Sequence, residues 1–253
     1  MLQQRKNMFD LKNKTAWITG GKRIGQRVAQ TLAGHGANIV VSYRTSSREA
    51  EEIIAKVKKL KVKTLSVQCD VSSEKSVKEA IKLISKKFKK VDVLVNMASV
   101  FNPVKFEKIT SEDWQSNFKA HVLGSFWTSQ KISKLMPKGG HIINIADRTS
   151  IGKIYKGYLP YVVTKAAIAN MTKALAVELG GRGIFVNAIA PGPILRPPDL
   201  SIKEWKKVRE SSLLKYPIDD KEAVRQFAIL VLYLSSVTMA SGHIYPLDQG
   251  QNL

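Results

Sequence analysis

The chain has 253 residues, of which 44% are hydrophobic and 24% are charged. This composition is typical of a folded globular protein and excludes an intrinsically disordered one. The 41 Lys and Arg residues outnumber the 20 Asp and Glu residues, and the formal net charge of +21 favours anionic partners such as nucleotides, acidic carrier proteins, nucleic acid or an acidic membrane.

Apolar runs suited to buried parallel strands alternate along the chain with segments of helical periodicity. In chain order, strands are expected at residues 15–19, 37–43, 63–69, 91–96, 141–146, 184–190 and 243–247. Helices are expected at residues 24–33, 49–60, 74–88, 112–135, 161–179, 203–208 and 221–234. The repeated strand–helix alternation predicts an α/β fold, a doubly wound parallel sheet of about seven strands with helices on both faces.

Nothing in the chain has the composition of an interdomain linker, so residues 1–253 are predicted to form one nucleotide-binding domain. Residues 193–216 form an irregular, proline-rich insertion and are expected to be a lid over the substrate. Its candidate substrate contacts are Arg196, Pro197, Pro198 and Trp205.

Several features of the sequence predict the cellular location of the protein. Cys69 is the single cysteine, which excludes an internal disulfide and predicts a reducing compartment. No apolar run approaches the roughly 20 residues that a membrane span needs. Residues 1–8 lack the apolar core of a secretory signal and are expected to be a flexible extension, with Met8 as an alternative start. We therefore expect a cytoplasmic protein without a membrane partner.

Two lysine-rich runs, residues 56–63 and 85–90, carry much of the positive charge. Both lie at the ends of predicted helices, where lysine side chains complement the helix dipole. Aromatic residues are sparse in both runs, so they lack the stacking platform of a single-strand-binding site. Solvated helix faces are favoured over a nucleic-acid surface, and no metal site is predicted.

A glycine-rich turn separates the first predicted strand from the first predicted helix. Glycines in this context let backbone N–H groups approach a pyrophosphate, and the helix N-terminus adds partial positive charge. The turn therefore predicts a nucleotide site made by Gly20, Lys22, Arg23, Ile24 and Gly25.

The end of the second predicted strand indicates which dinucleotide binds. A site that prefers NAD places a carboxylate here for the ribose 2′-hydroxyl. This chain instead has Tyr43, Arg44, Thr45 and Ser46, a cation and hydroxyls that suit a 2′-phosphate. NADP(H) is expected over NAD(H); the alternative is that Arg44 only caps the strand end.

Tyr161 and Lys165 are spaced i, i+4 at the start of a predicted helix and share one of its faces. An ammonium close to a phenol favours the phenolate, so Lys165 is expected to lower the pKa of Tyr161. Tyr161 would then be a proton donor near neutral pH. Lys165 is also expected to bind the ribose hydroxyls of the dinucleotide.

Taken in order along the chain, these motifs resemble the short-chain dehydrogenase/reductase family. The glycine turn, Asp70-Val71, residues 96–99, the Tyr161/Lys165 pair and Pro191-Gly192 follow the family's order. The resemblance implies a Rossmann-type fold, hydride transfer from a nicotinamide, and a homotetramer or homodimer. It also implies cofactor contacts by Asp70 and Val71 at the adenine, by Asn96, Ala98 and Ser99 along the cofactor, and by Pro191, Gly192 and Ile194 at the nicotinamide.

Asp147 stands where most family members carry a serine that donates to a ketone oxygen. An ionised carboxylate cannot donate a hydrogen bond, and it would oppose ionisation of Tyr161. It suits a substrate that has an N–H donor or a nitrogen to be protonated. In this aspartate, and in residues 22–25, 42–45 and 98–101, the chain resembles the pteridine reductase and dihydromonapterin reductase branch.

This second resemblance implies NADPH-dependent reduction of a C=N bond in a pterin-like ring. Phe101 matches the aromatic residue that stacks on the substrate ring, and Arg23 is expected near the same substrate. His121 matches a position at which most of the superfamily has an asparagine that holds a proton-relay water. The alternatives are that Phe101 is an ordinary pocket wall and that His121 is a hydrogen-bonded helix residue.

Three functions stay open. The first is reduction of a pterin-like cyclic imine with Tyr161, Lys165, Asp147 and His121 as the catalytic set. The second is a carbonyl reductase of the 3-oxoacyl-carrier-protein type, which the basic surface suits because the carrier is acidic. The third is a family member of weakened catalysis that serves as a binding protein.

Overall fold

The computed structural model describes residues 9–197, 200–215 and 218–253. The predicted N-terminal extension with Met8, and the candidate lid contact Pro198, lie outside the described residues. Within them, one sheet is formed by β1 (Thr15–Thr19), β2 (Asn38–Tyr43), β3 (Thr64–Gln68), β4 (Val93–Asn96), β5 (His141–Ile145), β6 (Phe185–Pro191) and β7 (Ile244–Leu247). The helices are α1 (Ile24–Gly34), α2 (Ser47–Lys58), α3 (Glu74–Lys87), α4 (Ser111–Phe118), α5 (Gly124–Ile132), α6 (Leu159–Gly180), α7 (Ile202–Glu210) and α8 (Asp220–Leu234).

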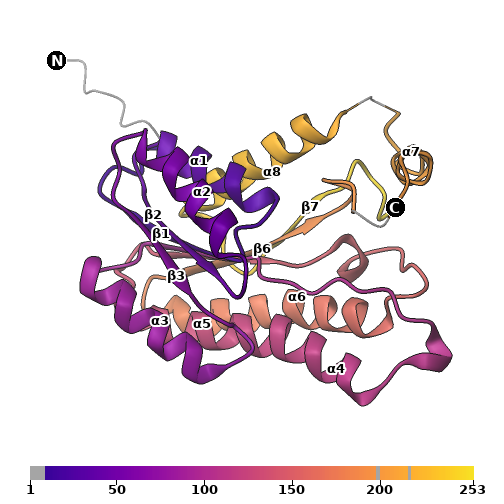
Figure 1. Cartoon of the computed structure of the whole chain (residues 1–253), viewed down its shortest axis with the longest axis horizontal. Helices are drawn as coiled ribbons and strands as arrows, with labels where there is room; N and C mark the ends of the chain where they lie inside the picture. Colours follow the sequence, from indigo (N-terminus) through magenta and orange to yellow (C-terminus); the bar gives the residue numbers. More distant parts are fainter. Residues whose placement is uncertain (1–8, 198–199, 216–217) are drawn as a thin grey trace.

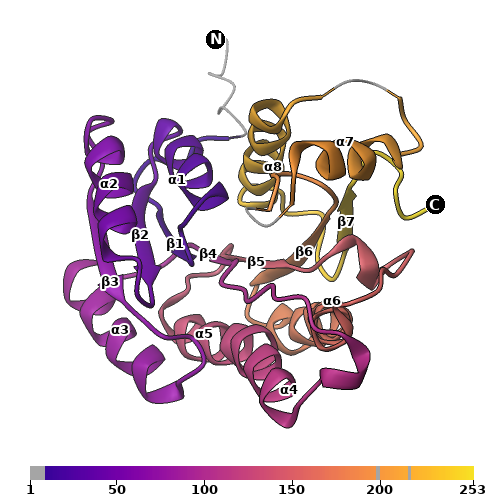
Figure 2. The same cartoon turned by 45° about the vertical axis from the view of Figure 1, so that its right-hand side comes forward.

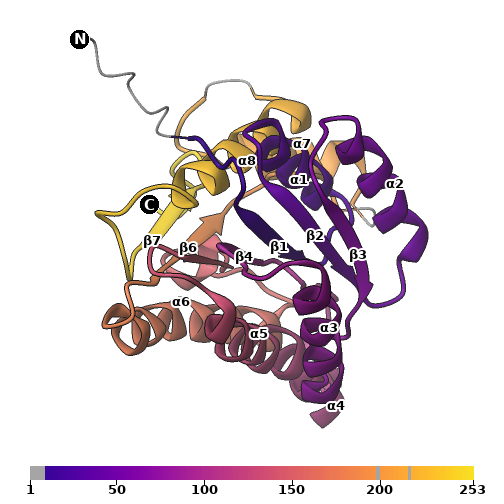
Figure 3. The ribbon, with the colours of Figure 1, turned by 90° about the vertical axis from the view of Figure 1, so that its left-hand side faces the viewer.

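The sheet has the order β3-β2-β1-β4-β5-β6-β7, and all neighbouring strands run parallel. Helices α1, α2 and α8 cover one face, and α3, α5 and α6 cover the other (Figures 1 and 3). The predicted doubly wound sheet is confirmed. Of the helices in the described residues, none combines the length and apolar character needed to cross a membrane.

The two helix layers enclose separate cores because successive strand residues point to opposite faces. In β1, Ala16 and Ile18 pack with α1 and α8, whereas Trp17 between them packs on the opposite face. The indole Nε1 of Trp17 donates to Ser42 Oγ at 3.0 Å, so the buried ring has its polar partner. Continuous apolar runs, rather than alternation, are what a sheet buried on both faces requires.

The sheet reverses its strand order between β1 and β4, which places a ligand crevice at their carboxyl ends. Thr19, the last residue of β1, lies beside Asn96, the last residue of β4. The Thr19 hydroxyl oxygen accepts hydrogen bonds from the backbone N–H groups of Met97 and Ala98, at 3.1 and 3.2 Å. The chain after β4 is thereby held against the glycine turn after β1.

The predicted helix over 112–135 is interrupted in the structure. Between α4 and α5 lies a π-helical segment, η2 (Lys119–Leu123), and a 3₁₀ turn, η3 (Ser133–Leu135), ends the run. The continuous helical pattern concealed the extra residue of the π turn. Two further 3₁₀ turns, η1 (Phe106–Lys108) and η4 (Arg148–Ser150), were not predicted. The other elements agree with the sequence to within about two residues, the usual uncertainty of helix and strand ends.

Candidate active site

A cleft of about 540 Å³ opens at the carboxyl ends of the central strands. This volume is within the range of small-molecule and cofactor sites. Most of the predicted site residues line it: Gly20, Lys22, Arg23, Ile24, Tyr43, Arg44, Thr45, Ser46, Asp70, Val71, Ala98, Ser99, Phe101, Tyr161, Lys165 and Pro191. Residues separated by more than 150 positions in the sequence are therefore brought to one crevice, as the strand order requires.

Asn96 is not among the residues that line the cleft. Its side-chain amide donates to Asn144 Oδ1 at 2.9 Å and to Ser129 Oγ at 3.1 Å, and its oxygen accepts from the Thr128 hydroxyl. These bonds tie β4 to β5 and α5 beneath the crevice. The side-chain amide is therefore fully bonded within the protein, and a cofactor contact by Asn96 stays a prediction.

Gly25, Gly192 and Ile194 also lie away from the cleft surface. Gly25 packs behind the turn, where an added Cβ would meet the Gly20 carbonyl oxygen at 3.4 Å. Gly192 packs on Asp248, whose Cβ would be 2.6 Å from an added Cβ. Ile194 is buried in the core beside α8. Gly25 therefore does not line the cleft at the predicted pyrophosphate turn, and Gly192 and Ile194 do not line it at the predicted nicotinamide position.

The glycine turn fits the approach of a pyrophosphate. Gly20 has a φ of 70°, and an added Cβ would lie 2.7 Å from Ala98 Cα, so only glycine fits there. Helix α1 begins at Ile24 without a side-chain cap at its N-terminus. Its first N–H groups are therefore available to an anion, and the helix dipole favours negative charge at this end.

The predicted 2′-phosphate corner lies beyond β2. Arg44 and Thr45 are exposed at the mouth of the cleft, and the backbone carbonyl of Arg44 accepts from Gln68 Nε2 at 3.1 Å. Lys22, across the turn, forms an ion pair with Glu49 at 2.8 Å. The Lys22 ammonium also lowers the pKa of the Glu49 carboxyl. Arg44 is therefore the better placed of the two cations for a phosphate.

Tyr161 and Lys165 face the cleft from the first turns of α6, which begins at Leu159 with Pro160 in its first turn. Both side chains are buried, with 7% and 4% exposed. The phenol of Tyr161 donates to Asp147 Oδ2 at 2.9 Å, and Lys165 Nζ donates to the Ile145 carbonyl at 2.7 Å. Lys165 Nζ lies 5.6 Å from the centre of the Tyr161 ring.

The pKa prediction for Tyr161 is wrong in this structure. Burial raises the pKa of Tyr161 well above its ordinary value, and the negative charge of Asp147 raises it further. Burial lowers the pKa of Lys165 to about 8, although Asp147 opposes this shift. Tyr161 is therefore a neutral phenol at neutral pH, able to give up a proton but not to accept one.

Asp147 is held in place by both of its carboxylate oxygens. Oδ1 accepts from the backbone N–H of Thr149 at 2.9 Å and from the Thr149 hydroxyl at 2.8 Å, which caps the turn η4. Oδ2 accepts from Tyr161. The carboxylate thus has a structural role in the turn and a second contact with the predicted proton donor.

An aromatic cluster surrounds this pair. The Phe101 ring stacks on Tyr158 with centroids 4.4 Å apart and meets the Tyr161 ring edge-on at 4.8 Å. Tyr155 packs edge-on against Tyr158, and the Arg148 guanidinium lies over the Tyr155 ring. Sequence reasoning did not assign Arg148, Tyr155 or Tyr158. The three-residue spacing of the tyrosines before the helix was the signal that could have found two of them.

His121 projects from the π segment and is 1% exposed. Its Nε2 accepts from the Val100 amide at 3.1 Å, so Nδ1 carries the proton and donates to the Thr164 hydroxyl at 2.9 Å. Burial, aided by the charge of Lys165, lowers the pKa of His121 to about 2. A neutral histidine joins the loop after β4 to α6, which favours the alternative of a hydrogen-bonded helix residue over a proton relay.

These histidines predict a stability that depends on pH. His141 begins β5 with 2% exposure, and burial lowers its pKa to about 4. The pKa values of His121 and His141 in the folded chain are both below the ordinary value of 6.5. On acidification these histidines therefore take up protons at a higher pH in the unfolded chain than in the folded chain. The contribution of the two histidines to the free energy of unfolding should be complete above about pH 6.5. As the pH falls below about 6.5, the free energy of unfolding should decrease by about 1.4 kcal/mol per pH unit for each histidine.

Urea unfolding at about pH 7 and pH 5 measures this effect. A His141→Gln variant should show a shallower dependence than the parent chain. Equal unfolding free energies at both pH values in the parent chain would contradict the assignment.

The chain matches known proteins over nearly its whole length. A family model described as enoyl-(acyl carrier protein) reductase matches residues 20–252. A 3-oxoacyl-[acyl-carrier-protein] reductase of Staphylococcus epidermidis is 36% identical over 187 residues, which are 72% of this chain and 76% of that protein. The corresponding reductase of Staphylococcus aureus is 32% identical over 227 residues, 88% of this chain and 91% of that one.

Solved structures of related proteins have the same fold as this chain. A short-chain dehydrogenase/reductase of Serratia marcescens has a TM-score of 0.89 at 27% identity, covering 96% of this chain and 100% of that one. A short-chain dehydrogenase of Burkholderia cenocepacia, solved in complex with NADP, has the same TM-score at 26% identity and the same coverage. This chain belongs to the short-chain dehydrogenase/reductase family, whose members are oxidoreductases that use a nicotinamide cofactor.

Proposed function

We propose that the chain is an NADPH-dependent reductase of a small molecule that carries a polarised double bond to nitrogen. The observation that carries the proposal is the hydrogen bond from Tyr161, which lines the cleft, to Asp147, which does not. A second solved relative, a blue fluorescent protein from a metagenomic library in complex with NADPH, supports the cofactor at a TM-score of 0.88 and 28% identity.

The residues present fit NADPH. The glycine turn and the start of α1 would hold the pyrophosphate, Arg44 and Thr45 the 2′-phosphate, and Lys165 the ribose. The adenine would lie by Asp70 and Val71, which also line the cleft. When bound, the reduced nicotinamide supplies a hydride to the substrate carbon.

The protein's own part in the reaction is to hold the substrate and supply a proton. Tyr161 is neutral at working pH, so its hydroxyl can protonate the substrate atom that gains negative charge. Asp147 orients that hydroxyl and accepts a hydrogen bond from a substrate N–H. The aromatic cluster offers Phe101 as a planar wall on which a heterocycle can stack.

This geometry favours a pterin-like C=N bond over a ketone. A ketone oxygen is best held by two donors, and a carboxylate at position 147 adds none to the hydroxyl of Tyr161. An imine nitrogen that becomes protonated is instead stabilised by a carboxylate nearby.

A carbonyl reductase of the 3-oxoacyl-carrier-protein type is the second candidate. The curated relatives favour it over the pterin-like substrate, because those named above reduce 3-oxoacyl carriers. The net charge of +21 suits an acidic carrier protein as partner. The two candidates share the cofactor and Tyr161 and differ in the role of Asp147.

Replacement of Asp147 distinguishes the candidates. With a dihydropterin and a 3-oxoacyl thioester as probes, Asp147→Ser should lower turnover of the dihydropterin by about 100-fold or more, since a positioned acid–base partner is lost. If the thioester is the substrate, serine instead supplies a donor and its turnover should rise. Asp147→Asn keeps an acceptor for the cap of η4 and isolates the effect of the charge.

NADPH affinity, measured by calorimetry, should be the same in the parent chain and both Asp147 variants. Faster thioester than dihydropterin turnover in the parent chain, raised further by serine, would overturn the first candidate. Inactivity towards both probes with intact NADPH binding would overturn both.

Arg44 is expected to set the cofactor preference. Arg44→Ala should lower NADPH affinity by about tenfold and leave NADH affinity unchanged, because only NADPH carries the phosphate that the guanidinium would bind. Fluorescence titration with both cofactors measures the ratio. An equal loss for NADH and NADPH would show that Arg44 acts on the strand end alone.

A homodimer or homotetramer stays a prediction, and we propose that α4 and α6 form its interface. Their exposed sides carry Trp114, Phe118, Val163 and Val177, the last 81% exposed. A second copy of the chain would remove this apolar surface from water. Light scattering should give a multiple of 28.1 kDa. Cytoplasmic location and the absence of membrane or nucleic-acid partners likewise stay predictions.

A further inference from the structure

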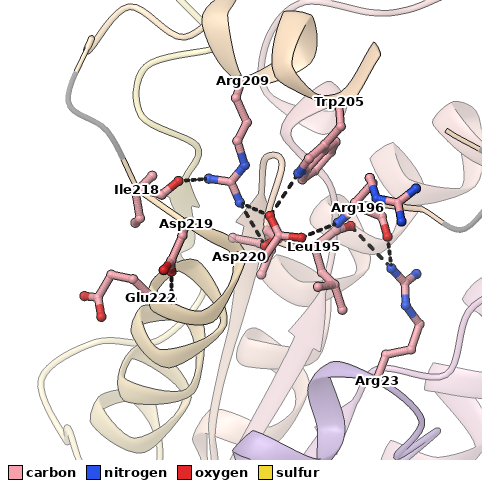
Figure 4. A network of polar contacts seen from close by, with 10 residues as sticks. Arg23, Leu195, Arg196, Trp205, Arg209, Ile218, Asp219, Asp220 and Glu222 are labelled. Atoms are coloured by element: carbon pink, nitrogen blue, oxygen red, sulfur yellow. Dashed lines mark hydrogen bonds and ion pairs between the residues drawn. The ribbon is translucent and has the colours of Figure 1, made fainter. Parts of the chain in front are cut away.

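The guanidinium of Arg23 joins the glycine turn to the predicted lid, a name used from here on for its described residues Leu195, Arg196 and α7. Arg23 precedes α1 with a φ of 69°, a conformation that is uncommon for residues other than glycine. Its Nη2 donates to the carbonyl of Arg196 at 2.6 Å and reaches the carbonyl of Leu195 at 3.4 Å (Figure 4). The two segments are 173 residues apart in sequence, so this contact joins distant parts of the chain.

A second anchor holds the lid from the other side. Asp220 is the first residue of α8, and its Oδ1 accepts from Trp205 Nε1 at 2.9 Å and from Arg209 Nη2 at 2.8 Å (Figure 4). Its Oδ2 accepts from the Arg196 backbone N–H at 3.2 Å. Trp205 and Arg209 lie on α7, which is thereby fastened to the end of α8 (Figure 2).

The Arg209 side chain completes this anchor. It donates to the carbonyls of Ile218 and Ile194, at 2.6 and 3.2 Å, and lies over the Trp205 ring. Burial opposes ionisation of Asp220, but the bonds from Trp205 and the Arg196 amide, with the charge of Arg209, hold its pKa below the ordinary value. Asp220 is therefore an anion at neutral pH and binds its three donors strongly.

The backbone of Arg196 is thus hydrogen-bonded to two different elements. Its carbonyl accepts from Arg23 of the glycine turn, and its amide donates to Asp220 of α8. We propose that Arg23 and Asp220 are positioning residues that couple occupancy of the glycine turn to the position of the lid. The proposal rests on the NADPH site described above.

The coupling has a simple physical origin. A dinucleotide that orders the glycine turn also fixes Arg23, and a fixed Arg23 keeps its bond to the lid. Closure of the lid in turn favours the ordered turn. The factor by which the cofactor shifts the lid towards the closed position therefore equals the factor by which closure raises cofactor affinity. Arg23 then acts through the lid, and its guanidinium points to the lid carbonyls rather than to the 2′-phosphate corner.

Limited trypsinolysis tests this coupling in the full chain. The lid helix α7 offers cleavage sites at Lys203, Lys206 and Lys207. Saturating NADP⁺ should slow cleavage at these sites by about fivefold or more in the parent chain, within the usual range of coupling between two sites. Mass spectrometry of the fragments identifies the cuts.

The variants separate positioning from folding. Arg23→Met keeps the side-chain length and removes the donor, so NADP⁺ should still bind but no longer protect the lid. Asp220→Ala should also abolish protection, whereas Asp220→Asn keeps acceptor capacity and should restore part of it. Arg27→Met, a cation lost from the exposed side of α1 and outside the residues that line the cleft, is the matched control and should retain full protection.

Calorimetry with NADP⁺ is done first on every variant, with thermal melting to confirm folding. Failure of the parent chain to bind NADP⁺ would overturn the NADPH site and the coupling together. Binding without protection in the parent chain, or full protection in Arg23→Met, would overturn the coupling alone. Loss of protection in Arg27→Met would show that positive charge near the start of α1, rather than the Arg23 contact, governs the lid.

Discussion

Tyr161→Phe should lower turnover by about 10²- to 10⁴-fold while leaving NADPH affinity unchanged. The phenylalanine keeps the ring in its contact with Phe101 and removes only the hydroxyl that donates to Asp147. The large effect is expected because the phenol is neutral at working pH and lines the cleft, where it can give its proton to the substrate. Steady-state kinetics and calorimetry measure the two quantities.

The matched control for this variant is Tyr245→Phe. Tyr245 is on β7, away from the residues that line the cleft, and its loss of a hydroxyl should leave turnover unchanged. Turnover of Tyr161→Phe within about threefold of the parent chain would show that another group, or water, supplies the proton.

Gly20→Ala should lower NADPH affinity by at least about tenfold. The added methyl group would lie 2.7 Å from Ala98 Cα, and an L-residue at a φ of 70° is strained, at a cost of about 1–3 kcal/mol. The turn or the chain after β4 must shift, and either shift displaces the N–H groups that face the pyrophosphate. Calorimetry with NADPH measures the loss.

Gly34→Ala provides the comparison for that variant. Gly34 ends α1, and an added Cβ there meets no atom within 4 Å. It should bind NADPH as the parent chain does and should be no less stable, because alanine is the better helix former. Equal affinities for Gly20→Ala and Gly34→Ala would contradict the assigned role of the turn.

The sheet could be predicted from the sequence because its signals are local. Residues 15–19 are a run of apolar and β-branched residues that end at glycine, and the structure has β1 over the same range. The assembly of the cleft followed from chain order, since parallel strands share one carboxyl edge. Tyr161 and Lys165 were predicted from their spacing and their position after a strand, whereas Asp147 was predicted from the resemblance to the short-chain dehydrogenase/reductase family.

What the sequence did not reveal depends on packing between distant segments. The pKa of Tyr161 is governed by burial, which the i, i+4 spacing to Lys165 does not report. The side-chain amide of Asn96 donates hydrogen bonds to residues of β5 and α5, and nothing near Asn96 in the sequence indicates these partners. The bond of Arg23 to the lid spans 173 residues, so residue type alone suggested a phosphate ligand instead.

The π turn at Lys119–Leu123 holds one residue more than an α-helical turn of the same span. Removal of a single residue there would restore regular α-helical hydrogen bonds and leave α4 and α5 in their present orientations. His121 would then leave Val100 and Thr164, while each helix kept its own apolar side. A one-residue deletion is thus a larger change to this site than most substitutions, and in evolution such a length change offers a short route to a differently shaped cleft on the same sheet.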